Sequence, residues 1–314
     1  MTETSRMTPE ARVFVAGHRG LVGSAIVRAL QERGYGDIVT ASRAELDLTR
    51  QAHVERFVAE TKPTHVIVAA AKVGGILANN THRWDFIRDN LLIESNLIDA
   101  SHQAGVNRLL FLGSSCIYPR ECPQPMREEY LLTGPLEPTN EPYAIAKIAG
   151  VKLCEALNAQ HSRQYLSVMP TNLYGPGDNF DLQTSHVLPA LIRKFHDAAQ
   201  SNAPHVIVWG TGKPRREFMY VDDLADACVF LLEQTDQTEL LNIGVGEDLS
   251  VLALAELIAD VVGFKGAIVH DLSKPDGTPQ KRLDTSRLTA LGWQPSTPLR
   301  AGIEATWKWW TQAH

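Results

Sequence analysis

Short apolar runs rich in β-branched residues alternate with longer segments of helical periodicity through the first half of the chain. The runs are RVFVAG at 12–17, DIVTAS at 37–42, THVIVAAA at 64–71 and RLLFLGSS at 108–115, and the helical segments fall at about 21–33, 51–60 and 84–104. Strands separated by helices pair in parallel through right-handed crossovers, which places helices on both faces of a sheet. The pattern therefore predicts an α/β fold built on a doubly wound parallel sheet, with a ligand crevice beyond the carboxyl ends of the strands.

A change of pattern near residue 174 predicts a second unit. A helix at about 143–160 and the strand YLSVM lead into the turn PTNLYGPGDNF at 170–180. A helix at about 188–199, the strand HVIVWG, the basic loop TGKPRREF and helices near 221 and at about 252–262 follow. We expect a first domain over 1–174, joined by returning segments near 215–245, and a smaller C-terminal α/β domain over 175–314.

The composition is that of an ordinary globular protein. The 314 residues are 44% hydrophobic, and 30 basic against 36 acidic residues give a net charge of -6 without long blocks of one sign, so we expect no nucleic-acid partner. No segment approaches the ~20 apolar residues of a membrane span and the polar start carries no signal peptide, which predicts a cytoplasmic protein without membrane contact. The four cysteines show neither CxxC pairs nor histidine spacing, so we expect no structural metal and no disulfide framework.

Three glycines in GHRGLVG, Gly17, Gly20 and Gly23, follow the first strand and open the first helix. Residues without side chains let a pyrophosphate approach the free N–H groups at a helix N-terminus. The spacing is GxxGxxG rather than GxGxxG, and tight packing alone is the other explanation for such a trio. Within a strand-helix-strand unit at the start of the chain, the glycines predict a Rossmann-type dinucleotide site in the first domain.

The end of the second strand distinguishes the two nicotinamide cofactors. An Asp or Glu there binds the ribose 2′-hydroxyl of NAD, whereas this chain has Arg43 in TASRAELDL and a second arginine, Arg19, in the glycine loop. Guanidinium groups form charge-assisted hydrogen bonds with a 2′-phosphate, which favours NADP(H). Glu45 and Asp47 lie so near that an error of ~2–4 residues in the predicted strand end would favour NAD instead.

Tyr143 and Lys147 in YAIAK stand four residues apart near the start of a helix, and so lie on one face of it. An unperturbed phenol has a pKa of about 10 and a nearby ammonium favours its anion, so we expect Lys147 to tune Tyr143. Such pairs are also common on protein surfaces. Together with the glycine loop and with Ser114 at the end of an earlier strand, the pair predicts a reductase site in which Ser114 and Tyr143 donate to a substrate oxygen.

These motifs together resemble the extended short-chain dehydrogenase/reductase family, and the resemblance covers nearly the whole chain. Seven segments in order are similar to the members that convert GDP-4-keto-6-deoxy-D-mannose to GDP-L-fucose by 3,5-epimerisation and NADPH-dependent 4-keto reduction: GHRGLVGSAI, AAAKVGGILANNT, FLGSSCIYP, EPTNEPYAIAKIAG, VMPTNLYGPGDNF, SHVLPALIRKFH and KPDGTPQK. The resemblance implies an oxidoreductase that is also an isomerase in nucleotide-sugar biosynthesis. It also implies a homodimer joined by a helical bundle, formed by the helices within 84–104 and 143–160.

The resemblance assigns the proton transfers of epimerisation to Cys116 and His186. A thiol and an imidazole have ordinary pKa values of about 8.5 and 6.5, on either side of neutrality, and which of the two is the base stays open. In a strand-like register, Ser114 and Cys116 would point to the same side with Ser115 turned away. From the residues alone, Cys116 is equally consistent with a small core residue and His186 with a residue near a helix cap.

The resemblance also implies which residues bind each ligand. The expected catalytic residues are Ser114, Cys116, Tyr143, Lys147 and His186. The expected cofactor-binding residues are Gly17, His18, Arg19, Gly20, Leu21, Val22, Gly23, Arg43, Asp47, Leu48, Leu112, Gly113, Ser114, Ser115, Lys147, Pro170, Thr171, Asn172, Leu173 and His186. The expected GDP-sugar-binding residues are Lys194, Trp209, Arg216, Asp276 and Lys281. Lys194 stands where family members often carry arginine, and Trp209 is equally consistent with core packing.

Two other functions stay open from the sequence. A 4-epimerase or 4,6-dehydratase of the same family would hold NAD tightly. The dehydratases usually carry Thr-Asp-Glu where this chain has Ser-Ser-Cys at 114–116, and a 4-epimerase needs no pair of Cys116 and His186. A non-catalytic NADP-binding regulator on the same fold is the second alternative, but such proteins tend to lose the tyrosine or lysine that this chain keeps at Tyr143 and Lys147.

Overall fold

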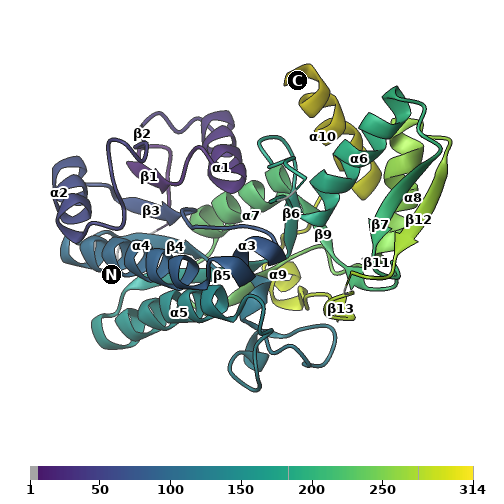
Figure 1. Cartoon of the computed structure of the whole chain (residues 1–314). Helices are drawn as coiled ribbons and strands as arrows, with labels where there is room; N and C mark the ends of the chain where they lie inside the picture. The colour runs from purple at the N-terminus through teal and green to yellow at the C-terminus, as the bar shows by residue number, and fades with distance from the viewer. Residues whose placement is uncertain (1–5, 183, 275, 314) are drawn as a thin grey trace.

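Six parallel strands form the central sheet of the computed structural model, in the order β10-β5-β4-β3-β1-β2 (Figure 1). The structure describes residues 6–182, 184–274 and 276–313, so residues 1–5 of the first predicted domain and residue 275 of the segment KPDGTPQK lie outside the described part. The strands are β1 (Val13–Ala16), β2 (Ile38–Val39), β3 (His65–Val68), β4 (Arg108–Leu112), β5 (Gln164–Pro170) and β10 (Leu241–Ile243). The predicted α/β fold with a doubly wound parallel sheet is confirmed.

Helices cover both faces of this sheet. They are α1 (Leu21–Glu32), α2 (Gln51–Thr61), α4 (Arg83–Gln103), α5 (Glu141–His161) and α7 (Val221–Gln234). Val13 and Val15 of β1 join a buried cluster with residues of α1 and α7, whereas Phe14 and Ala16 join a cluster with α2, α4 and α5. The two-residue period of the strand therefore divides its side chains between two cores.

The order of the strands reverses at β1. This strand lies between β2 and β3. After β1 the chain adds β2 on one side of it, and then adds β3, β4 and β5 in succession on the other side. Ligands of doubly wound sheets bind where the connections part in this way, beyond the carboxyl ends of the strands. The glycine loop at 17–20 lies at this point, directly after β1.

A second lobe holds most of the residues after 175 (Figure 1). Its buried cluster draws on helices α6, α8 and α10 and on strand β7. Its elements are α6 (Val187–Gln200), β7 (His205–Trp209), β8 (Arg215–Arg216), β11 (Leu249–Ser250), α8 (Val251–Val262), β12 (Ala267–Asp271), β13 (Gln280–Lys281) and α10 (Leu299–Ala313). The sequence patterns did not predict β12 or the short strands, because two to five residues of mixed polarity give little periodicity, and the 15-residue helix α10 was also not predicted.

Segments from the second half of the sequence complete the first lobe. Strand β10 is the edge strand beside β5, and α7 packs against α1. Asn242 in β10 is fully buried; its side chain accepts from Tyr118 Oη at 2.6 Å and its N–H donates to Glu128 Oε1 at 2.9 Å. The domain boundary at 174 stays a prediction, since the two lobes exchange segments in this way.

Short elements connect the larger ones. They are α3 (Ile76–Thr81), the 3₁₀ helices η1 (Ser115–Ile117) and η2 (Glu128–Tyr130), the paired strands β6 (Asn172–Tyr174) and β9 (Phe218–Tyr220), and α9 (Ser286–Ala290). None of the helices in the described residues is both long and apolar enough to cross a bilayer. The expected cytoplasmic location stays a prediction.

Helices α4 and α5 run side by side along the sheet (Figure 1). A Cβ at Gly150 of α5 would come within 2.3 Å of the Phe111 ring in β4, so only glycine lets α5 lie this close to the strand. This approach brings Tyr143 and Lys147, in the first turns of α5, to the carboxyl end of β4.

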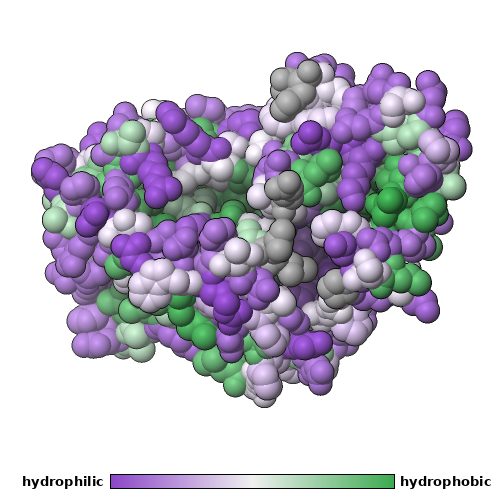
Figure 2. All heavy atoms as spheres, in the orientation of Figure 1, coloured by the Kyte–Doolittle hydropathy of each residue, from purple (hydrophilic) through white to green (hydrophobic). Residues whose placement is uncertain are grey.

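Hydrophobic residues gather on the surface over β7, β12 and α8, at the right of Figure 2. Ile207 of β7 and Val269 of β12 are partners in the parallel pairing of these strands, and both are exposed. The two-stranded sheet thus has one face on the core of the second lobe and one face open to solvent.

Candidate active site

The glycine loop between β1 and α1 forms a cradle for an anion. Gly17 has a φ of 88°, a conformation that favours glycine, and a Cβ there would come within 2.8 Å of the backbone of Ala70. A Cβ at Gly23 would lie 2.1 Å from the carbonyl oxygen of Gly17. Gly20 is the N-cap residue of α1. Because it has no side chain, it leaves the N-terminus of the helix uncovered. The loop therefore fits a pyrophosphate on the first N–H groups of α1.

The carboxylates after β2 are held by local hydrogen bonds. Glu45 Oε2 accepts from the N–H and the hydroxyl of Ser42, at 2.7 and 2.6 Å. Asp47 Oδ1 accepts from the N–H and the hydroxyl of Thr49, at 3.0 and 2.7 Å. These bonds hold the pKa of both carboxyl groups below its usual range. A carboxylate that already accepts hydrogen bonds from its own turn is a poor acceptor for a ribose hydroxyl.

Two arginines lie beside this turn. Arg19 and Arg43 are exposed, and neither forms a hydrogen bond or ion pair within the described ranges. The charge of Arg19 acts on Glu45 and that of Arg43 acts on Asp47, so both guanidinium groups border the same turn. The arrangement fits a cofactor phosphate better than a ribose hydroxyl, as expected for NADP(H).

The chain turns sharply after β4. Ile117 N–H bonds to the carbonyl oxygen of Ser114 at 3.2 Å and Cys116 N–H bonds to Ser114 Oγ at 3.3 Å, which closes the 3₁₀ helix η1. The expected strand-like register through 114–116 is therefore wrong. The accessible side of the chain is nonetheless the expected one: Ser114 and Cys116 are partly exposed and Ser115 is buried.

Lys147 is buried between α5, α4 and β4. Its ammonium donates to the carbonyl oxygen of Leu112 at 3.0 Å and pairs with Glu94 Oε1 at 2.8 Å. It also lies 4.7 Å from the centroid of the Phe111 ring. These contacts fix a positive charge at the carboxyl end of β4, next to the crevice.

Tyr143 lies one helical turn from Lys147. Burial raises the pKa of Tyr143, the charges of Cys116 and Glu94 raise it further, and a hydrogen bond with Ser114 opposes them. The expected lowering by Lys147 is not what the structure shows, because burial of the phenol dominates and the Lys147 ammonium is paired with the carboxylate of Glu94. The phenol therefore holds its proton at neutral pH.

Cations from the second lobe face Cys116. Burial lowers the pKa of Arg216, and the charge of Cys116 opposes that shift, so the guanidinium and the thiol are near each other. Lys281 is the partner of Arg216 in the parallel pairing of β13 with β8, which places the two side chains on one face of that small sheet. The Cys116 thiol thus lies near a positive charge from the second lobe.

His186 lies at the start of α6, in the second lobe. It is the N-cap residue of α6, as one expectation from the sequence had it, but its side chain makes no capping hydrogen bond. The imidazole is accessible to solvent but lies among protein atoms, and this partial desolvation lowers the pKa of His186. The preceding segment is tied to the first lobe, since Gly75 N–H donates to the carbonyl oxygen of Thr184 at 3.2 Å. No hydrogen bond joins His186 to Cys116 within the described part of the chain.

Trp209 at the end of β7 forms an exposed platform. It is 55% exposed, which excludes core packing. Lys194 Nζ and Lys274 Nζ lie 5.2 and 5.3 Å from its ring centroid. Asp276 accepts from the N–H and hydroxyl of Thr211 at 2.6 and 2.8 Å, which holds the adjoining loop. An aromatic ring between two ammonium groups fits a nucleobase with its attached phosphates.

The turn after β5 is held by a buried carboxylate, Glu217. Its Oε1 accepts from the N–H groups of Val245 and Gly246 at 2.6 and 2.8 Å, and burial raises its pKa. Its carbonyl oxygen accepts from Asn172 Nδ2 at 2.8 Å. The expected cofactor segment 170–173 is thereby tied to the strand that carries Arg216.

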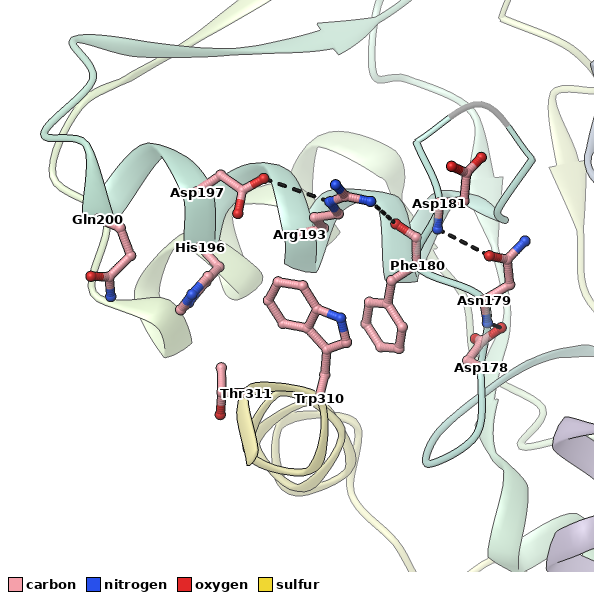
Figure 3. Close-up of a pocket in the computed structure, with 10 residues that line it drawn as sticks. All are labelled: Asp178, Asn179, Phe180, Asp181, Arg193, His196, Asp197, Gln200, Trp310 and Thr311. Carbon is pink, nitrogen blue, oxygen red and sulfur yellow. Dashed lines mark hydrogen bonds and ion pairs between the residues drawn. The ribbon is translucent and has the colours of Figure 1, made fainter. Parts of the chain in front are cut away.

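A separate cavity of about 850 Å³ lies between α6 and α10 (Figure 3). Phe180 and Trp310 stack in it with ring centroids 5.3 Å apart, and Arg193 donates to the carbonyl oxygen of Phe180 at 3.1 Å. Asp178 also lines it, and burial raises its pKa to about 7. None of the expected site residues lines this cavity, so it is not the candidate active site.

Sequence reasoning missed three residues of this region: Glu94, Glu217 and Lys274. Glu94 had a signal, since LLIESNLI places one acidic residue in an apolar stretch of a helix. Glu217 and Lys274 had none, because their partners lie on strands distant in sequence.

Known proteins resemble this chain over nearly its full length. The sequence profile of the NAD dependent epimerase/dehydratase family matches residues 13–244. The chain is 58% identical to GDP-L-fucose synthase 1 of Arabidopsis thaliana over 310 residues, with 98% of this chain and 96% of that protein covered. It is 55% identical to GDP-L-fucose synthase of Escherichia coli (strain K12), with 96% and 97% covered. The structure of a GDP-L-fucose synthetase from Naegleria fowleri bound to NADP superposes with a TM-score of 0.90 at 29% identity, covering 99% of this chain and 98% of that one.

Replacing Arg19 and Arg43 together with alanine is expected to weaken NADPH binding about 100-fold and NADH binding less than about threefold, since each charge-assisted hydrogen bond to the 2′-phosphate contributes about 1.5–3 kcal/mol. Fluorescence titration with both cofactors measures the two affinities. Arg50→Ala is the matched control, because Arg50 borders the same turn but is paired with Asp47 at 3.7 Å. Equal losses for the two cofactors would contradict the assignment.

Proposed function

The chain belongs to the NAD dependent epimerase/dehydratase family and, within it, to the GDP-L-fucose synthases, and we propose that it converts GDP-4-keto-6-deoxy-D-mannose to GDP-L-fucose with NADPH. The reaction is a 3,5-epimerisation followed by a 4-keto reduction, so the protein is an NADP-dependent oxidoreductase with epimerase activity. The resemblance predicted from the sequence is confirmed. The observation that carries the proposal is the meeting of Ser114, Cys116 and Tyr143 after β4, with Arg216 facing them from the second lobe.

The residues of the first lobe fit NADPH. Gly17 and Gly23 keep side chains away from the N-terminus of α1, and Arg19 and Arg43 are available for the 2′-phosphate. Lys147 presents its ammonium at the end of β4, where a ribose hydroxyl can accept from it. When bound, NADPH supplies the hydride that reduces C4 of the sugar.

Both halves of the reaction develop negative charge on the same oxygen, that of the C4 ketone. An enolate forms when a proton leaves C3 or C5, and an alkoxide forms during the reduction. Ser114 and Tyr143 are the donors at this place, and each bond to the oxygen strengthens as its charge grows. Because its pKa is raised, Tyr143 keeps its proton until the alkoxide takes it.

Epimerisation needs one group that removes a proton from one face of the ring and another that returns a proton to the other face. Cys116 in η1 belongs to the first lobe, and His186 before α6 belongs to the second. A ring held between the lobes would therefore meet the thiol and the imidazole from different sides. This arrangement supports the assignment of the two residues to C3 and C5.

The nucleotide end of the substrate is assigned to the second lobe. Trp209 offers an exposed ring for the guanine, and Lys194, Lys274 and Arg216 offer positive charge for the diphosphate. A lysine at 194 provides a point charge rather than the paired donors of an arginine. Lys281, beside Arg216, is assigned to the same negative group.

NADPH oxidation with GDP-4-keto-6-deoxy-D-mannose tests the proposal. We expect oxidation of NADPH by the purified protein, and at least tenfold lower kcat/KM with the dTDP- and UDP-linked analogues. Tightly retained NAD without net oxidation would instead identify a 4-epimerase or dehydratase. Tight NADPH binding without any turnover would identify a regulator.

Cys116→Ser is expected to lower turnover about 10²–10⁴-fold, because a hydroxyl is a much weaker acid-base group than a thiol near neutrality. NADPH affinity and the melting temperature should stay within error of wild type, since Cys116 is half-buried and its backbone N–H, which bonds to Ser114 Oγ, is unchanged by the substitution. Solvent deuterium incorporation at C3 and C5 measures the step directly. Near-normal incorporation in the variant would exclude Cys116 from epimerisation.

We further propose that the protein is a homodimer through α4 and α5. Trp84 is 72% exposed on α4, and Ile145 and Leu153 on α5 are 42% and 39% exposed, so this helix pair presents apolar side chains to solvent. Changing Ile145 and Leu153 to glutamate should convert a dimer to a monomer in sedimentation velocity. Ile207→Glu, an equally exposed position on the second lobe, should leave the dimer intact. A wild-type monomer at micromolar concentration would refute the proposal.

A further inference from the structure

Glu94 is a buried acid next to the site, and the mechanism above gives it no role. It lies on α4 with a side chain 1% exposed, and its Oε1 is 2.8 Å from the ammonium of Lys147 on α5. The other carboxylate oxygen, Oε2, is buried and makes no hydrogen bond to any residue that the structure describes. An ionised carboxylate in this position is sustained chiefly by Lys147.

The carboxylate of Glu94 interacts electrostatically with the titratable groups around it. From α5, Lys147 opposes the rise in pKa that burial causes at Glu94. Burial is the largest cause of the raised pKa values of Tyr143 and Cys154, and the Glu94 carboxylate raises both further. From η1, Cys116 raises the pKa of Tyr143 further, and Ser114 before η1 opposes both through its hydrogen bond. The Lys147 ammonium lies 6.0 Å from the centroid of the Tyr143 ring, so Tyr143 is near both this cation and the carboxylate paired with it.

Stability alone is a poor explanation for this pair. Taking two charges out of water costs several kcal/mol per ion, and well-packed apolar residues of similar volume usually do as well or better. Apolar residues lie beside the pair: Leu97 and Ile98 of α4 and Val151 of α5 join one buried cluster. A second α4–α5 ion pair among the described residues, Arg83 with Glu141, is exposed, whereas the pair of Glu94 and Lys147 is buried. A buried ion pair one helical turn from Tyr143 points to a role in the site.

We propose that Glu94 is a positioning residue for the reduction: its carboxylate orients the Lys147 ammonium and balances its charge, so that the Tyr143 hydroxyl keeps the proton that it gives to the C4 oxygen. This inference rests on the proposed function. Without the carboxylate, the ammonium would act on Tyr143 alone and would favour the phenolate, which cannot donate.

Glu94→Gln tests the role, because it removes the charge and preserves the shape of the side chain. NADPH oxidation with GDP-4-keto-6-deoxy-D-mannose is followed from pH 6 to 10. We expect kcat at pH 8 to fall about tenfold, because the Lys147 ammonium loses the partner that orients it in the site. We expect the alkaline limb of the profile to move about one pH unit lower, since an uncompensated charge within ~4–6 Å shifts a pKa by about 1–3 units. NADPH affinity should change less than about threefold. Glu155→Gln is the matched control, as it removes a carboxylate from an exposed pair with Lys152.

A second measurement needs no substrate. Protein labelled with ¹³C at the tyrosine ζ carbon contains seven tyrosines, and Tyr143→Phe identifies the resonance of Tyr143. In the wild type this resonance should stay that of the phenol up to pH 10, and in Glu94→Gln it should move toward the phenolate at lower pH. If the wild type oxidises no NADPH with the GDP-sugar, the proposed function fails while this titration still decides the role of Glu94.

Two results would overturn the inference. One is a Glu94→Gln protein whose alkaline limb and Tyr143 titration both match the wild type, even if its melting temperature falls, because the ion pair would then be merely structural. If Glu94→Gln does not fold, Glu94→Asp replaces it: the shorter side chain draws the carboxylate away from Lys147, so kcat should fall severalfold. A wild-type kcat and pH profile in Glu94→Asp would equally refute the role.

Discussion

The buried ammonium of Lys147 is the constraint on which the site depends. A charge removed from water must be met by fixed partners, and here they are the carbonyl oxygen of Leu112 and the carboxylate of Glu94, at 3.0 and 2.8 Å. Those partners belong to β4 and α4, while Lys147 belongs to α5. The hydrogen bond and the ion pair of Lys147 therefore fix these three elements relative to one another. The same contacts position Tyr143, which lies one turn away on α5.

The two lobes depend on each other through buried polar contacts. Glu217 precedes β9. Its carboxylate accepts from a backbone N–H after β10, and its carbonyl oxygen accepts from the side chain of Asn172 after β5. Asn242 ties β10 to Tyr118 and Glu128 in the segment after β4. Because buried donors and acceptors are costly to leave unpaired, these contacts hold Arg216 opposite Cys116 without a continuous core across the cleft.

Much of the site was predictable from local pattern. The glycine loop is recognisable because a close backbone approach requires residues without side chains, as at Gly17 and Gly23. The four-residue spacing of Tyr143 and Lys147 reflects one face of a helix. The turn at 114–116 was not predictable. A 3₁₀ turn and a strand both place Ser114 and Cys116 on the accessible side, so the same sequence pattern is compatible with either. The direction of the pKa shift of Tyr143 was missed for another reason: it depends first on burial and then on the charges of Cys116 and Glu94, which only the packing of distant segments brings to the phenol.

The sequence by itself determined the alternation of strands and helices, the dinucleotide loop and the spacing of Tyr143 and Lys147 on one helix face, because each of these depends on residues within a few positions of one another. The tertiary structure decided which charges meet. Glu94 beside Lys147, Arg216 near Cys116 and Lys274 over Trp209 are pairs that form only when distant elements pack. Electrostatic interactions act through space and grow as water is excluded, so they depend on burial and distance, which no local pattern records.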